Sequence, residues 1–417
     1  MQKSNKNPIR LFLTFCAVAI IARILFFFIA SISPEFLPYQ PSFSYPDALE
    51  RYSLPKWIYS FAGFDGVHYL VIAERGYKSA GMIQAFFPVW PLILDFGHST
   101  ISQLGIKQLN TISWGLFLNG LILPILLFTW HTFVHAIYPE LVSPKKKWLP
   151  TLLLLSFPTS LFFFALYSEA LFLTLVLGSF LAAHTKNWKL AIVLTIVASA
   201  TRIVGVLLVP ALLLEFWWQQ QSLATKHFEW QAIKKSLHFR ALFRFLVTNY
   251  KMILALALGS LGLLSYMTYL YLTFGDPLLF KTVQSTWGHQ RSDSLILYPQ
   301  VIFRYMKMFF VSFSFTVGWF TIIQEFLVGI SLPWLPLLFY KKIRPSHLLF
   351  GSSVLLVPIA TGTFSSLPRY ALAAFSIFLV LLYILKDKPK LTAVWLSLST
   401  FLLICNTILF IQGYWVG

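Results

Sequence analysis

Long apolar runs separated by short polar segments fill almost the whole chain. An apolar run of about 18 or more residues is long enough for a helix that crosses a bilayer. The pattern predicts an all-α polytopic membrane protein with about 10–11 transmembrane helices, although several runs are shorter than a full span. The runs lie at about residues 11–32, 112–138, 149–166, 170–184, 190–203, 204–217, 252–273, 308–338, 347–364, 371–385 and 392–415.

Three of these regions predict something other than one straight span. The 149–184 and 190–217 regions each resemble two short helices that meet at a polar turn. The turns are "YSE" at 167–169 and "SATR" at 199–202. The long 308–338 region predicts either one span or an interfacial helix followed by a span.

Composition agrees with the membrane class. Hydrophobic residues make up 58% of the chain and charged residues 11%, whereas soluble proteins carry about 25% charged residues. The net charge of +18 could indicate a nucleic-acid partner, but most of the 32 Lys and Arg residues cluster in alternate loops. This positive-inside pattern predicts a cytoplasmic N-terminus, a basic cytoplasmic loop at 217–251, and extracytoplasmic loops at 33–110 and 274–305. Residues 1–417 are predicted to form one integral domain with no nucleic-acid partner.

Polar groups from several loops would meet at the extracytoplasmic surface in this topology. An ionisable group at membrane depth costs about 2.5–3.5 kcal/mol on insertion scales, so each needs a partner or a function. An aspartate can deprotonate a hydroxyl nucleophile, and arginines can hold a phosphate by bidentate hydrogen bonds. This combination suits transfer of a sugar from a lipid-linked sugar phosphate to an alcohol. The candidates are Asp65 as the base, Arg202 and Arg369 for the phosphate, and His68 and Glu169 as further lining residues.

Each of these residues also has a structural alternative. Asp65 and His68 are three residues apart and would share a helix face, where His68 could orient the acceptor or simply be a hydrogen-bonded interfacial histidine. The pair could hold a metal, but two ligands without a further cluster are weak evidence, so we expect no metal and no cofactor. Among the arginines, Arg23 could pair with an acid, Arg202 could cap a turn, and Arg369 could reach the interface.

The first outer loop carries two further patterns. Glu74 and Arg75 suit a solvated helix end, with Gly76 in the position after the last helical residue. The segment "AFFPVWPLI" at 85–93 predicts a second helix that lies on the membrane surface.

The loop at 274–305 and the segment "LPRY" at 367–370 offer additional contacts. Gln284 and Trp287 could supply hydrogen bonds and a stacking surface for a sugar, and Tyr370 adjoins Arg369. Asp276 follows a glycine and precedes a proline, which favours a turn over a second catalytic acid.

Six segments occur in the order seen in PIG-V-like mannosyltransferases, and the chain resembles this family over about residues 9–385. The segments are "FDGVHYLVIAERGY", "AFFPVWPLI", "LYSEALF", "SATRIVGVLLVP", "FGDPLLFKTVQSTWG" and "LPRYALAAFSIF". The first block is the most specific, whereas the short SATR and PRY pieces would mean little alone.

The resemblance implies a GT-C membrane fold and a polyprenyl-phosphate-linked sugar, usually mannose, as the donor. It also implies inverting transfer to a lipid or glycan acceptor on the outer face, with an acid of the first outer loop as base, which maps onto Asp65. The family usually has Trp before this acid, and here Phe64 keeps a ring but loses the indole N–H. The short loops incline us towards a bacterial inner-membrane enzyme of cell-envelope glycan or glycolipid assembly, whereas a eukaryotic chain would be expected in the endoplasmic reticulum.

Two other functions remain compatible with the residues. A transporter or flippase of lipid-linked saccharides would explain the polar groups and the broken helices equally well. It would need acids and bases in the inner half of the bundle, where the sequence has few. A non-catalytic subunit that positions a partner glycosyltransferase is also compatible.

Overall fold

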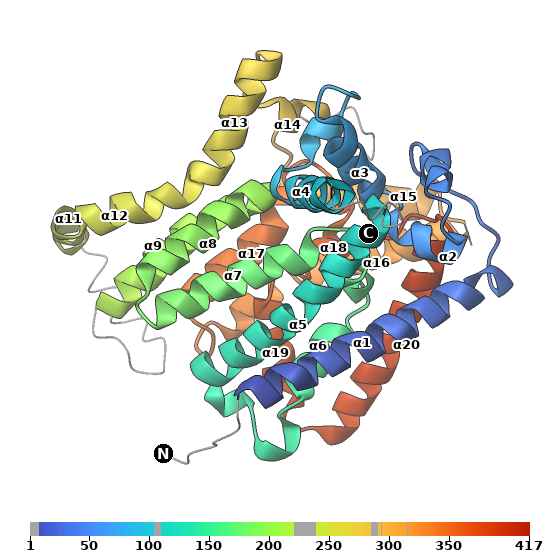
Figure 1. Cartoon of the computed structure of the whole chain (residues 1–417). Helices are drawn as coiled ribbons and strands as arrows, with labels where there is room; N and C mark the ends of the chain where they lie inside the picture. The colour runs from blue at the N-terminus through green and yellow to red at the C-terminus, as the bar shows by residue number, and fades with distance from the viewer. Residues whose placement is uncertain (1–7, 104–109, 221–238, 285–290, 293, 315) are drawn as a thin grey trace. The chain divides into compact units, whose positions relative to one another are not determined.

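The computed structural model of the chain describes residues 8–103, 110–220, 239–284, 291–292, 294–314 and 316–417. These residues form helices and turns with no strand, so the all-α prediction is confirmed for them (Figure 1). The chain divides into two compact units, which are described separately below. The first unit comprises Met1–Thr174, Ser314–Ile322 and Leu385–Gly417, and the second comprises Leu175–Phe313 and Ile323–Ile384.

The helices vary widely in length. The first unit contains α1 (Pro8–Ile32), α2 (Lys56–Tyr59), α3 (Asp65–Arg75), α4 (Val89–Gln103), α5 (Thr111–Ile137), α6 (Leu149–Leu155) and α20 (Pro389–Ile411). The second contains α8 (Trp188–Thr201), α9 (Leu208–Gln220), α11 (Phe239–Thr248), α12 (Tyr250–Ala257), α13 (Leu261–Phe274), α14 (Leu279–Thr282), α15 (Tyr298–Val311), α17 (Pro345–Ile359) and α18 (Leu367–Tyr370). Residues of both units occur in α7 (Glu169–His184), α16 (Val317–Ser331) and α19 (Ser376–Leu385).

Among the described residues, six helical segments are long and apolar enough to cross a membrane. They are Pro8–Glu35, Thr111–Ile137, Ile203–Gln220, Tyr250–Phe274, Val317–Phe339 and Pro389–Ile411. The shorter apolar helices are Glu169–His184, Trp188–Thr201, Pro345–Ile359 and Ser376–Leu385. These findings agree with a multi-pass α-helical membrane protein.

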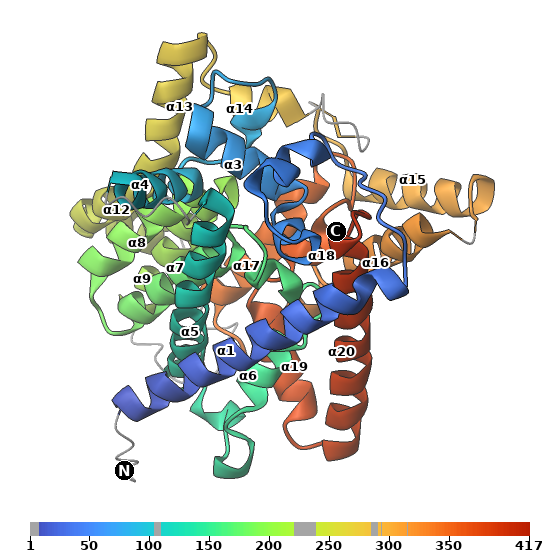
Figure 2. The ribbon, with the colours of Figure 1, turned by 45° about the vertical axis from the view of Figure 1, so that its right-hand side comes forward.

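Helix α1 organises the first unit. It packs against α5 and against α20, and Figures 1 and 2 show it crossing both obliquely. Helix α3 packs on α4, and α4 packs on α5. The segment "AFFPVWPLI" therefore does begin a helix, but only from Val89 onward. The short helix α3, which carries Asp65, is thus supported through α4 by a long apolar helix.

The prediction of a span at 149–166 is wrong. Helix α6 ends at Leu155, and the chain then passes through turns and a short 3-10 helix, Ser160–Phe163, before α7 begins. Pro158 has no N–H with which to continue α6. The Ser160 hydroxyl instead donates to the carbonyl of Leu154 at 2.5 Å. We call residues 156–168 the unwound segment.

The carbonyl groups of the unwound segment accept hydrogen bonds from side chains of three distant helices. Arg23, for which an acidic partner was one alternative, donates to the carbonyls of Phe164 and Leu116. Non-helical backbone at membrane depth persists only where such internal partners exist. The other donors are Asn119 to the carbonyl of Ala165, Ser399 to that of Ser156 at 2.7 Å, and Asn406 to that of Pro158 at 3.0 Å.

Close contact between α8 and α13 characterises the second unit. A Cβ atom added at Gly262 would lie 2.0 Å from the carbonyl oxygen of Ile196, so only glycine permits this approach. The Ser199 hydroxyl donates to the carbonyl of Gly259 at 2.8 Å. Small residues and hydroxyl groups often allow helices to pack this closely in membranes.

The 308–338 region is not one continuous span, and the interfacial placement of its first part stays a prediction. Helix α15 ends at Val311, and a separate candidate span covers Val317–Phe339. The predicted run at 371–385 becomes helical only from Ser376.

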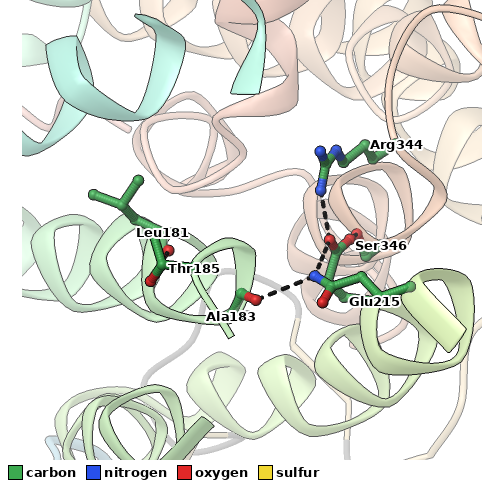
Figure 3. A network of polar contacts seen from close by, with 7 residues as sticks. Leu181, Ala183, Thr185, Glu215, Arg344 and Ser346 are labelled. Carbon is green, nitrogen blue, oxygen red and sulfur yellow. Dashed lines mark hydrogen bonds and ion pairs between the residues drawn. The ribbon is translucent and has the colours of Figure 1, made fainter. Parts of the chain in front are cut away.

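A buried carboxylate joins three helices of the second unit (Figure 3). Glu215 in α9 is 1% exposed and accepts from Arg344 and Ser346, both at 2.6 Å, and from Gln219 at 3.0 Å. Gln219 also donates to the carbonyl of Ala183 in α7 at 3.1 Å. The network therefore connects the end of α7, the end of α9 and the start of α17.

We predict that Arg344→Ala lowers the free energy of unfolding by about 3–5 kcal/mol, because it leaves the Glu215 carboxylate buried without its cation. Glu215→Ala should cost less, since the Arg344 side chain is 26% exposed and can reach water. Denaturant unfolding in detergent would measure both changes. The exposed cation Lys341 provides the control, Lys341→Ala. An equal decrease in the free energy of unfolding in Arg344→Ala and Lys341→Ala would contradict the prediction.

Candidate functional site

Asp65 is the first residue of α3, where an acidic side chain interacts favourably with the helix dipole. Within residues 61–70, Asp65 is the only one that is not buried. The helix ends at Arg75, and Gly76 follows with φ of 73°, as the sequence predicted. The structure therefore presents one partly exposed carboxylate in an otherwise buried stretch.

The backbone at Asp65 is held by the unwound segment. The Asp65 N–H donates to the Tyr167 hydroxyl oxygen at 3.1 Å, and that hydroxyl donates to the carbonyl of Gly63 at 3.2 Å. The N–H of Leu166 also donates to the carbonyl of Phe61 at 2.8 Å. Because Tyr167 is 1% exposed, it cannot move without disturbing its neighbours.

Phe64 takes a strained conformation immediately before Asp65. Its φ is 54° and its ψ is −118°, a combination that costs a non-glycine residue of order 1–3 kcal/mol. Ring packing compensates for this, because Phe64 lies 4.8 Å from Phe43, 5.4 Å from Phe410 and 5.6 Å from Trp415 between ring centroids. The aromatic ring that precedes the acid is thus used for internal packing.

His68 lies one turn after Asp65 and is 4% exposed. Its ring stacks on Phe86 with centroids 5.0 Å apart and an interplanar angle of 19°. The Tyr77 hydroxyl fixes Phe86 by donating to its carbonyl at 2.7 Å. Burial lowers the pKa of His68 to about 4, although the nearby Asp65 acts in the opposite direction. His68 is therefore a neutral imidazole at pH 7.

Glu74 lies near the exposed end of α3, as the sequence suggested, and its carboxylate is also engaged by neighbouring side chains. It accepts hydrogen bonds from Arg51 and Tyr52, both at 2.6 Å, and from Thr111 at 2.8 Å. These contacts tie the end of α3 to the start of α5 and to the 3-10 helix Pro46–Tyr52. The carboxylate therefore has a structural role.

In the second unit, Arg202 and Arg369 share one aromatic ring. Arg202 is extended, with φ of −150° and ψ of 144°, between α8 and the 3-10 helix Ile203–Leu207, so the predicted break at "SATR" is confirmed. Its guanidinium carbon lies 5.3 Å from the Tyr370 ring centroid, and that of Arg369 lies 5.7 Å from it. Cation–π attraction can hold both groups in place. Two positive charges are thus concentrated around one tyrosine, and Arg369 is buried.

A buried acid positions the segment that carries Arg369. Glu325 in α16 is 4% exposed; it accepts from the Tyr305 hydroxyl at 2.9 Å and from the Ser366 N–H at 3.4 Å. Ser366 has a positive φ of 65°, and the Phe364 N–H donates to the Tyr305 hydroxyl oxygen at 3.2 Å. Burial and the charge of Glu325 raise the pKa of Tyr305, which keeps the hydroxyl protonated.

The remaining predicted residues fall in different places. Glu169 begins α7 and is 5% exposed, and the preceding Ser168 lies 3.3 Å from the Tyr69 hydroxyl of α3. Gln284 accepts from Arg291 at 3.3 Å within its own loop. Trp287 lies outside the described residues. Asp276 is a turn residue as predicted, because it accepts from the Leu278 N–H at 2.8 Å.

The predicted residues thus form two groups. Asp65 and His68 share one helix of the first unit, with Glu169 at the end of the unwound segment that contacts this helix. Arg202, Arg369 and Tyr370 come together in the second unit. Within the described residues, no group of three or more His, Cys, Asp or Glu side chains could hold a metal ion.

Sequence reasoning missed two positioning residues, Tyr167 and Glu325. Glu325 could have been found, because an acid within an apolar helix needs a partner. Tyr167 gave no comparable signal, since a tyrosine in an apolar segment usually packs as an aromatic residue.

We predict that His68 makes the protein less stable in acid. Its pKa is about 4 in the folded protein and about 6.5 when unfolded, so only the unfolded chain binds a proton between these values. The free energy of unfolding should fall by about 3 kcal/mol as the pH drops from 6.5 to 4. In His68→Gln this contribution should disappear from the pH profile measured in detergent. The same replacement at the half-buried His98, His98→Gln, supplies the control. If the pH dependence of the free energy of unfolding were the same in His68→Gln as in the wild type, the prediction would be contradicted.

Three comparisons with known proteins were made: a scan against models of protein families, a search of curated proteins and a search of solved structures. None of them found a match to this chain.

Proposed function

We propose that the chain is a membrane glycosyltransferase with a GT-C-like fold. It would transfer a sugar, with mannose as the first candidate, from a polyprenyl phosphate to a hydroxyl group of a lipid or glycan. The proposal depends most on one observation: Asp65 is partly exposed in a buried stretch, and Tyr167 holds its backbone N–H. The ordered resemblance to PIG-V-like mannosyltransferases supplies the substrate class.

In the proposed reaction, Asp65 accepts the proton of the acceptor hydroxyl. The acceptor oxygen attacks the anomeric carbon, and the bond from that carbon to the phosphate oxygen breaks. Polyprenyl phosphate leaves with the electron pair, and a single displacement inverts the anomeric configuration. The fixed backbone at Asp65 would hold the carboxylate at the distance that proton transfer requires.

The other residues take supporting roles. We assign Arg202 and Arg369 to the donor phosphate, because two guanidinium groups can neutralise the charge that develops on it. Tyr370 lies against both groups and would orient them. Gln284, Trp287 and Glu169 keep their assignment to substrate contacts, and neutral His68 would brace the face that carries Asp65.

The setting of the reaction is also part of the proposal. A cytoplasmic N-terminus would place these residues on the extracytoplasmic face, where polyprenyl-linked donors are used. We favour the inner membrane of a bacterium and an acceptor of the cell envelope, in keeping with the short loops.

We predict that Asp65→Asn lowers the rate of sugar transfer by about 100-fold to 10,000-fold, the usual contribution of a general base. Purified protein in lipid would receive radiolabelled polyprenyl-phosphate sugars, beginning with mannose, and a membrane lipid extract. Label in a new glycolipid would report transfer. The exposed Asp95 of α4 provides the matched control, Asp95→Asn, and thermal unfolding would check that both variants fold.

The outcomes separate the candidate functions. Transfer by wild type and Asp95→Asn alone would support the enzyme with Asp65 as its base. Equal transfer by Asp65→Asn would overturn the role of Asp65. Movement of intact labelled donor across the bilayer, without transfer, would favour a transporter or flippase.

We also predict that Arg202→Lys raises the KM for the donor by about tenfold and changes kcat less. Lysine keeps the charge but cannot make two parallel hydrogen bonds to a phosphate. Initial rates at varied donor concentration would measure the change. Arg75→Lys makes the same replacement at the exposed end of α3, and a similar KM in both variants would argue against phosphate binding by Arg202.

A further inference from the structure

Helix α11 has a strongly segregated surface. Its sequence, FRALFRFLVT, places the apolar Phe243 and Leu246 three residues apart, along one side of the helix. Arg244 and Thr248 are four residues apart along another side. Phe243 is 60% exposed and Leu246 is 45% exposed, and Arg244 is exposed as well. The helix therefore presents apolar and cationic side chains together.

The protein covers another side of α11, the one that carries Phe245. The Phe245 ring lies 5.8 Å from that of Phe216, between centroids, and packs against the buried pair Trp217 and Trp218. This contact attaches α11 to the end of α9. This contact does not cover the side chains of Phe243 and Leu246, which remain exposed.

The chain bends sharply between α11 and the next candidate span. Tyr250–Phe274 begins two residues after α11 ends. The Asn249 N–H and its side-chain amide both donate to the carbonyl of Phe245 at 3.0 Å, which closes the last turn of α11. Figure 1 shows α11 nearly end on while α12 runs across the view. This bend separates α11 from the candidate span, and a helix so placed is free to lie along the membrane surface if its side chains suit that position.

We propose that α11 is an in-plane helix that docks on the membrane surface and binds anionic phospholipid. Phe243 and Leu246 would enter the boundary between headgroups and acyl chains, as the apolar faces of interfacial helices do. Arg244, together with Lys251, would contact the phosphodiester groups of anionic headgroups.

The charges explain why anionic lipid is the favoured partner. The described part of this region, residues 239–251, contains basic residues at 240, 244 and 251 and no acidic residue. A basic residue near an anionic surface strengthens binding by about fivefold, and zwitterionic lipid provides no comparable attraction. The uncovered aromatic and aliphatic side chains supply the anchoring that is independent of lipid charge.

The test uses the full-length protein with Cys16 and Cys405 replaced by alanine, reconstituted into phosphatidylcholine vesicles containing phosphatidylglycerol. A nitroxide would be attached at Phe243→Cys or, as the matched control, at the exposed Thr248→Cys on the polar side. We expect the label at 243 to be reached mainly by oxygen in the bilayer and the label at 248 mainly by a water-soluble nickel chelate. Equal access of the nickel chelate to both labels would overturn the in-plane placement.

Lipid selectivity forms the second arm of the test. Spin-labelled phosphatidylglycerol and phosphatidylcholine would be compared for the fraction immobilised by the protein. We expect a preference for phosphatidylglycerol that falls about fivefold in Arg244→Gln and does not change in Lys189→Gln, which removes an exposed charge from α8. No preference in the wild type, or an equal fall in both variants, would overturn the binding of anionic lipid by Arg244.

Discussion

Backbone polar groups in an apolar environment need partners inside the protein, and this constraint governs the first unit. The unwound segment at 156–168 breaks what would otherwise be a span and thereby exposes carbonyl groups. Side chains from α1, α5 and α20 donate to them. Each of these helices is thereby tied to one irregular stretch, which in turn carries Tyr167 to the start of α3. The placement of Asp65 therefore depends on hydrogen bonds made in the interior of the bundle.

Carboxylates perform the corresponding role in the second unit. Glu215 and Glu325 are both buried, and each accepts hydrogen bonds from groups on other elements. A buried charge is tolerated when its hydrogen-bonding capacity is met by well-placed donors. Glu325 shapes the short segment that precedes Arg369, whereas Glu215 fastens helix ends. Two similar residues thus serve two different parts of the fold.

The sequence predicted those features that depend on local composition. Long apolar runs such as 112–138 became helices, and α5 continues even through Pro124. The turn at Arg202 was also predictable, since polar residues there interrupt an apolar run. The prediction of a span at 149–166 was wrong because the conformation of this segment depends on hydrogen bonds from Arg23, Asn119 and Asn406, which are far away in the sequence. The pairing of Arg202 with the Tyr370 ring and the anchoring of Asp65 by Tyr167 are long-range contacts of the same kind.

Arg23 has a further consequence for the way in which this chain is made. The residue lies near the middle of α1, and its carbonyl partner at Phe164 is synthesised 141 residues later. During translation, α1 therefore enters the bilayer with a cation whose partner has not yet been made. The Pro8–Glu35 segment is nevertheless apolar enough to cross a membrane, which offsets the insertion cost of one arginine. The hydrogen bond between α1 and the unwound segment can therefore form only after α6 has been synthesised.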